Sequence, residues 1–300
     1  MSEKQPTSNP EEEPKIPQIE SSPEEIGKLR ILQIREKYLQ PLEGEIEKTP
    51  EEVRFITKAN EWIEQELKEL QIDTRPTRIK PEQVHILSDA GWETEAGWGN
   101  HDDAYNKAYG NTIIIHSERV QGQLERMAII LHEAIHLQSH HKFRTNEDPS
   151  YRDGYMAENQ SHETSFEGFN EAVVEGLTMH LMYNHEKELE SEFKIDLENL
   201  NDNLFNYRNY VDLLSLIVTD VAKKKGESME VVRDKILRGL FSGETIHLQD
   251  IEETYGRTAL QVINYLGVEG KSQKVFNFFS EKDDDKRNII AEEILKKTSQ

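Results

Sequence analysis

Residues 118–142, ERVQGQLERMAIILHEAIHLQSHHK, contain the pattern that decides the fold of this 300-residue chain. Apolar side chains recur there at steps of three and four, which is the spacing of an amphipathic α-helix. These residues are Val120, Leu124, Met127, Leu131 and Ile135. Further apolar residues at Ile129, Ile130 and Leu137 broaden the apolar face. The stretch therefore predicts a helix that is buried on more than one side.

The string His132-Glu133-Ala134-Ile135-His136 lies within this predicted helix and fits the pattern H-E-x-x-H. Residues four apart on a helix differ by about 40° around its axis, so both imidazoles project from one face and can reach one Zn²⁺. A carboxylate beside a zinc-bound water can accept its proton. The string therefore predicts a zinc site with His132 and His136 as ligands and Glu133 as the general base.

A catalytic zinc site needs a third protein ligand and one open position. The metzincin pattern is excluded because Ser139 and Lys142 occupy the positions of its glycine and third histidine. His140 lies two helical turns from His132, roughly 12 Å along the axis, so one straight helix does not bring both to one ion. We expect His140 and His141 to form a solvated helix end.

A second predicted apolar helix, at residues 167–183, offers a better source for the third ligand. Glu171 and Glu175 lie one helical turn apart on it and share a face. Two carboxylates beside Val173 and Val174 on an apolar helix require partners that stabilise their charge. A zinc ligand and a hydrogen-bond partner for a ligand histidine would provide it.

HEAIH followed by Asn170-Glu171-Ala172-x-x-Glu175 resembles the gluzincin metallopeptidases, the thermolysin-like and aminopeptidase-like zincins. The resemblance covers about residues 81–183 and implies zinc-dependent peptide hydrolysis. It implies Glu171 as the third ligand and Glu175 as the partner of a ligand histidine, although an alternative alignment places ligation at Glu175. The interval between the two motifs is long, so residues 143–165 are expected to form an inserted polar loop. No G-x-M-E-N string is present, so aminopeptidase specificity is not supported.

The resemblance also assigns two supporting roles. In such zincins an edge strand runs antiparallel to the extended substrate, and the β-branched run 112–116 would be that strand. The expected substrate-binding residues are Thr112, Ile113, Ile114 and Ile115. In such enzymes a side chain from the C-terminal lobe stabilises the oxyanion, and the candidates for it here are Tyr207, Arg208 and Tyr210.

The sequence predicts an α+β fold centred on a zincin-like catalytic domain at residues 81–200. This domain would combine a small sheet, with one strand at 84–87 and a loop or hairpin at 91–105, with the two motif helices. A helical region at residues 22–80 would precede it, and a C-terminal helical lobe at 201–300 would follow. Residues 1–21 are acidic and proline-rich and are expected to be a disordered tail.

Two helix starts are expected in the N-terminal helical region. Ser22-Pro23 and Thr49-Pro50 each place a capping hydroxyl before a proline, with a glutamate three residues after the cap. Both starts favour structural helices rather than catalytic elements.

The composition restricts the classes of partner and of metal ligand that we expect for this chain. Acidic residues number 58 and basic residues 36, a net charge of −22 that disfavours nucleic acid or an anionic membrane as the main partner. Cysteine is absent, so any metal must be bound by His, Asp or Glu. No apolar run is long enough to cross a bilayer, and the first residues lack the apolar core of a signal peptide. We therefore expect a cytoplasmic zinc metallopeptidase with a peptide or protein substrate. Two alternatives are a binding or regulatory protein with little proteolysis and a zinc hydrolase with a non-peptide substrate.

Overall fold

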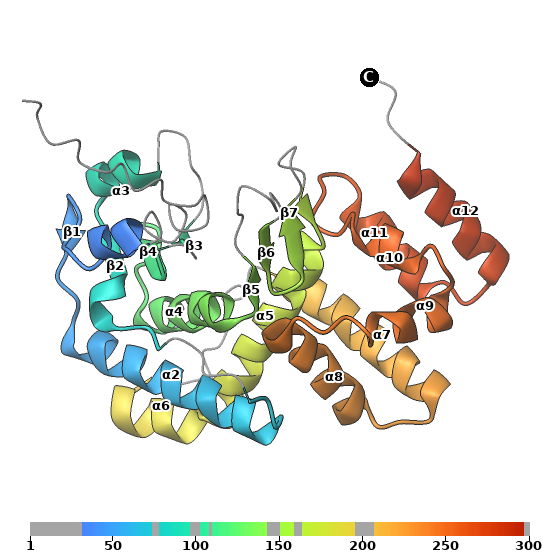
Figure 1. Ribbon diagram of the computed structural model, residues 1–300, viewed down its shortest axis with the longest axis horizontal. Coiled ribbons are helices and arrows are strands. Elements are labelled where there is room, and N and C mark those ends of the chain that lie inside the picture. Colours follow the sequence, from blue (N-terminus) through green and yellow to red (C-terminus); the bar gives the residue numbers. More distant parts are fainter. Residues whose placement is uncertain are drawn as a thin grey trace, which may run out of the picture.

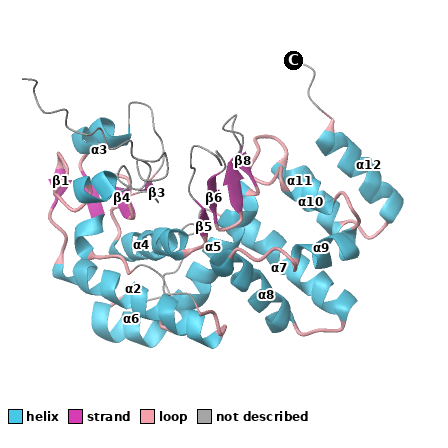
Figure 2. Cartoon of the chain, in the orientation of Figure 1, coloured by secondary structure: helices cyan, strands magenta, loops and turns pink. Residues whose placement is uncertain are grey.

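The computed structural model describes residues 32–73, 78–96, 103–107, 110–142, 151–158, 164–195 and 207–296. Within these residues the fold is α+β, as predicted, with two small four-stranded sheets and a mostly helical C-terminal half (Figures 1 and 2). None of the helices in these ranges has both the length and the apolar composition of a bilayer-spanning segment. The predicted tail at residues 1–21 lies outside the described residues.

Helix α2 (Pro50–Glu69) begins where the sequence predicts. The Thr49 hydroxyl accepts a hydrogen bond from the backbone N–H of Glu52, and the Glu52 carboxylate accepts one from the backbone N–H of Thr49. This reciprocal pair satisfies two of the donors that a helix start leaves open. The helix predicted from Ser22 to about Leu39 lies in the described part from residue 32 onwards, and residues 32–37 are helical.

The first sheet has the strand order β1-β2-β4-β3. Its strands are β1 (Glu45–Ile46), β2 (Val84–Leu87), β3 (Ala104–Lys107) and β4 (Thr112–His116). Strand β4 pairs in parallel with β2 on one side and antiparallel with β3 on the other. The expectation that Thr112–Ile115 forms an edge strand open to substrate is therefore wrong, because both neighbours use its backbone groups. Among the described residues, β3 occupies that edge.

The glycine-rich stretch at residues 91–105 differs from the predicted loop or hairpin. It contains most of helix α3 (Asp89–Ala96), and β3 begins at its end. Trp92 in α3 is only 2% exposed and packs in a small core with Leu87 and Ile114. Burial of this large ring against the sheet outweighs the low helix propensity of Gly91.

Helix α4 (Gln123–Gln138) carries the H-E-x-x-H string. It contacts α2, α5, β3 and β4, so the prediction of a helix buried on several sides is confirmed. The helix ends at Gln138 rather than near Lys142. His140 and His141 are half-buried and lie beyond the helix, so the expected solvated helix end is wrong.

Part of the predicted polar loop at residues 143–165 forms three strands, which join the preceding strand β5 in an antiparallel sheet of order β5-β6-β7-β8. Its strands are β5 (His141–Lys142), β6 (Tyr151–Asp153), β7 (Met156–Glu158) and β8 (Thr164–Ser165). The turn between β6 and β7 is anchored by Tyr155, whose buried ring packs on Phe169 and whose hydroxyl donates to the Ile236 carbonyl. Distant partners therefore order a segment that has no apolar period of its own.

The remaining helices connect to the motif helix through α5. They are α5 (Glu167–Asn184), α6 (Glu186–Phe193), α7 (Arg208–Lys225), α8 (Met229–Ser242), α9 (Leu248–Tyr255), α10 (Ala259–Ile263), α11 (Ser272–Ser280) and α12 (Asp284–Leu295). Helix α5 contacts α4 on one side and α7 on the other. A continuous apolar core runs from Phe55 in α2 to Ile294 in α12. This packing fixes α5 beside α4 and gives its glutamates a defined position.

Candidate metal centre

Three side chains from α4 and α5 converge on one point. Nε2 of His132 lies 3.2 Å from Nε2 of His136 and 3.2 Å from Oε2 of Glu171. Nε2 of His136 lies 3.3 Å from Oε1 of Glu171. The two histidines share a face of α4 because they are four residues apart, and the contact between α4 and α5 places Glu171 opposite them.

The spacing of these donor atoms fits a metal ion. A tetrahedral zinc ion with bonds of about 2.0–2.1 Å holds its donors roughly 3.3–3.4 Å apart. The three distances of 3.2, 3.2 and 3.3 Å lie close to that separation. His132, His136 and Glu171 could therefore hold a metal ion, and two imidazoles with one carboxylate leave a fourth position open.

The charges at the centre also favour a bound cation. Burial disfavours a charged imidazolium, but the carboxylates of Glu171 and Glu175 outweigh it and hold the pKa of His132 well above its usual range. Burial also lowers the pKa of His136, but Glu171 outweighs burial and raises this pKa to about 9. Burial by itself would raise the pKa of Glu171. The two histidines outweigh burial and hold that pKa well below its usual range. The carboxylates thus attract positive charge, which protons or a metal ion can provide.

Glu175 lies on the opposite side of the His132 ring from Glu171. Its Oε2 lies 3.0 Å from Nδ1 of His132, and its Oε1 accepts a hydrogen bond of 3.2 Å from the backbone N–H of Tyr207. A carboxylate on Nδ1 favours the tautomer that leaves the Nε2 lone pair free for a metal. The geometry therefore fits Glu175 as the partner of His132 and does not fit the alternative alignment with Glu175 as a ligand.

Two residues to which the sequence assigned no role of their own border His136. Nδ2 of Asn170 lies 3.4 Å and Oδ2 of Asp153 lies 3.9 Å from Nδ1 of its ring. Asp153 is buried and also accepts a hydrogen bond of 2.8 Å from the Ser139 hydroxyl. Asn170 could have been found from its place directly before Glu171, whereas Asp153 lies in the stretch predicted as a loop.

Glu133 has a partner from the edge of the first sheet. Nδ2 of Asn106 in β3 donates a hydrogen bond of 2.8 Å to Oε2 of Glu133. Glu133 is 9% exposed, so this contact constrains a carboxylate that has little freedom to move. The sequence offered no signal for Asn106, because it follows a stretch that reads as a loop.

The two candidate tyrosines differ in position. The ring of Tyr207 stacks on that of His132 with centroids 5.9 Å apart, so Tyr207 lies at the centre. The centroid of the Tyr210 ring lies 5.5 Å from that of Tyr207, and Tyr210 lines a cavity between α7 and α11. Arg208 pairs with Asp212 on the surface of α7. Residues Thr112–Ile115 lie in the inner strand β4, whereas Asn106 in β3 reaches Glu133.

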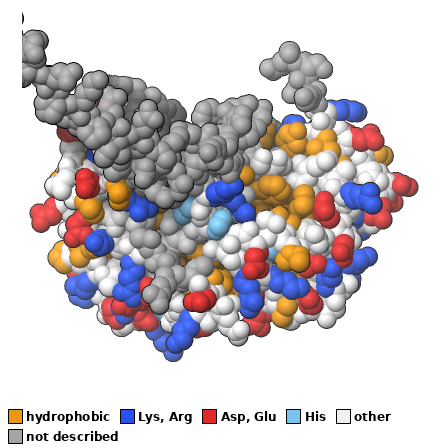
Figure 3. All heavy atoms as spheres, in the orientation of Figure 1, with side chains coloured by type: hydrophobic (Ala, Val, Ile, Leu, Met, Phe, Trp, Pro, Cys, Tyr) orange, Lys and Arg blue, Asp and Glu red, His pale blue; other side chains and the backbone are white. Residues whose placement is uncertain are grey.

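In the space-filling view, histidine side chains are visible near the middle of the face, beside a patch of hydrophobic side chains (Figure 3). Comparisons of the chain with protein-family models, with curated proteins and with solved structures gave no match. The fold and the geometry thus define an α+β protein with a possible buried His-His-Glu metal site.

Proposed function

We propose that this chain is a zinc-dependent metallopeptidase of the gluzincin type. The observation that carries the proposal is the convergence of His132, His136 and Glu171 at donor spacings suited to zinc, with Glu133 adjacent to His132 in the chain. Glu175 fits the role of the carboxylate that orients a ligand histidine. The resemblance of the two helix motifs to those of gluzincins is a second support for this function.

A zinc ion bound here would supply a Lewis acid that polarises the scissile carbonyl and acidifies a water molecule. Glu133 would accept a proton from the attacking water as the water oxygen bonds to the carbonyl carbon, and would pass that proton to the amine nitrogen as the C–N bond breaks. Asn106 holds the Glu133 carboxylate in one orientation through its 2.8 Å hydrogen bond. Tyr207, stacked on His132, is better placed than Tyr210 to donate a hydroxyl to the developing oxyanion.

A peptide is the substrate that the neighbouring sheet favours. Strand β3 lies at the described edge of the first sheet, and its residue Asn106 contacts Glu133. An extended peptide that adds to this edge gains main-chain hydrogen bonds and runs past the general base. The edge strand β3 thus takes the role that the sequence analysis assigned to β4.

The test combines metal analysis with cleavage of an unbiased peptide library. Wild-type protein should contain about one zinc per chain, and His132→Ala or His136→Ala should remove it. His180→Ala is the matched control, because His180 also faces a carboxylate, Glu66, but lies outside the centre. Stoichiometric zinc in both ligand variants would contradict the site.

The general base separates an enzyme from a binding protein. Glu133→Gln keeps the size of the side chain and removes its basicity, so zinc should stay while cleavage falls by at least ~10²-fold. Undiminished cleavage by this variant would refute the mechanism. A zinc-loaded wild type that cleaves no library peptide would favour a binding or regulatory protein, or a hydrolase with a non-peptide substrate.

A further inference from the structure

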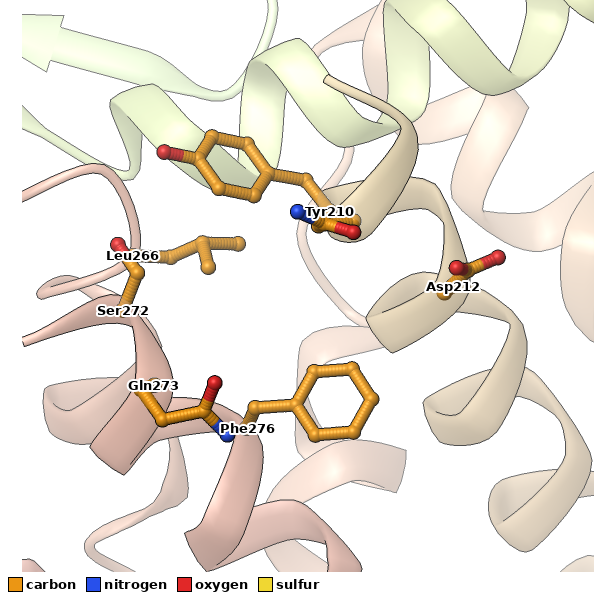
Figure 4. A pocket seen from close by; sticks show the side chains of 7 residues that line it. Tyr210, Asp212, Leu266, Ser272, Gln273 and Phe276 are labelled. Atoms are coloured by element: carbon orange, nitrogen blue, oxygen red, sulfur yellow. The ribbon is translucent and has the colours of Figure 1, made fainter. Parts of the chain in front are cut away.

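The two histidines of the candidate metal centre have neighbours on different sides. Glu175 lies 3.0 Å from Nδ1 of His132, and the Tyr207 ring stacks on the same imidazole. Tyr210 follows on that side and lines the cavity between α7 and α11 (Figure 4). The neighbours of Nδ1 of His136 come instead from α5 and from strand β6 of the second sheet. The second sheet thus borders one of the two proposed histidine ligands.

The side-chain amide of Asn170 presents a donor to His136. Its Oδ1 accepts a 2.8 Å hydrogen bond from the backbone N–H of Tyr155. A Cβ at Gly154 would lie 2.5 Å from this oxygen, so the turn between β6 and β7 closes tightly around it. The amide nitrogen is therefore the group that lies 3.4 Å from Nδ1 of His136, and an amide NH₂ can only donate.

A metal ion on Nε2 of His136 requires an acceptor at the other ring nitrogen. A neutral imidazole that binds a metal through Nε2 carries its proton on Nδ1, and this N–H almost always donates to a carboxylate, a carbonyl or water. In the described part of the chain, the neighbouring acceptor is the carboxylate of Asp153, whose Oδ2 lies 3.9 Å from Nδ1. This separation is about 1 Å longer than a hydrogen bond, a gap that small movements of the two side chains close.

The second sheet holds Asp153 in place for this contact. The residue is 4% exposed, and its backbone pairs with His141 of β5. Its Oδ1 accepts a 2.8 Å hydrogen bond from the Ser139 hydroxyl, which leaves Oδ2 to face His136. A buried carboxylate is costly unless charged or polar groups surround it, and an imidazole N–H is such a group.

We propose that Asp153 is a positioning residue for the metal centre: its carboxylate accepts the Nδ1–H of His136 and so directs Nε2 of that ring at the ion. The inference rests on the proposed function in taking His136 as a metal ligand. Each histidine then has its own carboxylate, Glu175 for His132 and Asp153 for His136. The segment between the two motif helices supplies the second one, because Asp153 lies at the end of β6.

The experiment compares three single variants of the full chain with the wild type. Asp153→Ala removes the acceptor. Asp153→Asn keeps the shape and one acceptor oxygen but removes the charge, so it carries the test if Asp153→Ala does not fold. Ser139→Ala is the matched control, because it removes the hydroxyl bound to Asp153 and leaves the carboxylate that faces His136. Circular dichroism and thermal melts verify that each variant is folded.

Zinc affinity is the first measurement, made on the metal-free proteins by competition with a chromophoric chelator. Loss of the partner of a ligand histidine weakens metal binding by about 10–100-fold. Asp153→Ala should fall in that range, and Asp153→Asn should lose less affinity because its amide oxygen can still accept. Ser139→Ala should bind zinc as tightly as the wild type.

The second measurement detects the ring proton itself. Cobalt(II) in place of zinc shifts the protons of its ligands far outside the ordinary ¹H NMR range. The wild type should show two such signals that are absent in D₂O, one Nδ1–H for each ligand histidine. Either Asp153 variant should shift or remove one signal, and Glu175→Gln should alter the other. A purely structural role for Asp153 would leave both signals in place.

The outcomes separate this role from the peptidase. Unchanged zinc affinity and unchanged signals in a folded Asp153 variant would overturn the positioning role and leave the peptidase standing. An equal loss of affinity in Ser139→Ala would also overturn it, because the carboxylate would then act through the hydroxyl. Loss confined to the Asp153 variants, in a protein that cleaves no peptide, would support the positioning role and refute the proposed function. Stoichiometric zinc retained in His136→Ala would overturn both.

Discussion

Glu175→Gln gives the sharpest test of how the metal centre is held. The carboxylate is 4% exposed and serves two neighbours, with Oε2 at 3.0 Å from Nδ1 of His132 and Oε1 at 3.2 Å from the backbone N–H of Tyr207. Glutamine has one acceptor oxygen, so its carbonyl can serve only one of these donors, and its NH₂ then faces the other.

The size of the effect follows from that mismatch. Loss of a carboxylate behind a ligand histidine weakens metal binding by about 10–100-fold, or roughly 1.4–2.7 kcal/mol. The buried donor left without an acceptor costs a further ~1–3 kcal/mol of folding stability. Glu171→Gln alters a proposed ligand directly, so we expect it to weaken zinc binding more than Glu175→Gln does.

The assay is competition for zinc against a chromophoric chelator at neutral pH, with thermal melts of the metal-free proteins. Glu188→Gln is the matched control, because Glu188 faces Nδ1 of His185 at 3.1 Å in the same kind of pair, away from the centre. It should leave zinc affinity unchanged. The reasoning fails if Glu175→Gln releases zinc more readily than Glu171→Gln, or if Glu175→Gln binds zinc as tightly as wild type.

Three further outcomes are expected. Asn106→Ala removes the amide that orients the proposed general base, so kcat should fall about tenfold while zinc content, measured by elemental analysis, stays the same; an unchanged kcat would argue against positioning. The raised pKa of His136, about 9 without metal, means that zinc must displace a proton near pH 7, so zinc affinity should rise from pH 7 to pH 9 and binding should release protons to an indicator dye. A pH-independent affinity would contradict this. Gly239→Ala adds a Cβ that overlaps the buried Tyr155 hydroxyl, so urea melts should show a loss of ~1–3 kcal/mol, whereas Gly176→Ala, whose Cβ meets only ordinary contacts at 3.8 Å, should not destabilise.

The parts of this protein that the sequence determined by itself depend on neighbours within about one helical turn. Thr49 and Glu52 cap α2 reciprocally because the helix start brings residues three apart together. His132 and His136 share a face of α4 because four residues make about one turn. The β-branched run 112–116 forms a strand because its side chains suit a pleated, buried surface.

Tertiary structure decided everything that depends on pairing across long intervals. Whether β4 was inner or edge depended on β3, whose pairing no local pattern specifies. Helix α3 is stabilised by the burial of Trp92 in a core cluster with residues of the first sheet. The strands within residues 151–165 are stabilised by Tyr155, whose hydroxyl donates a hydrogen bond to the distant Ile236 carbonyl.

The centre shows the same division. The α4 motif presents two nitrogens, but only the packing of α5 on α4 turned Glu171 towards them and Glu175 towards the far side of His132. Asn106 contacts Glu133 of α4 from strand β3, and no spacing along the chain could indicate this contact. A periodic pattern fixes which side chains share a face, whereas the opposing face is chosen by burial and hydrogen bonding across the whole core.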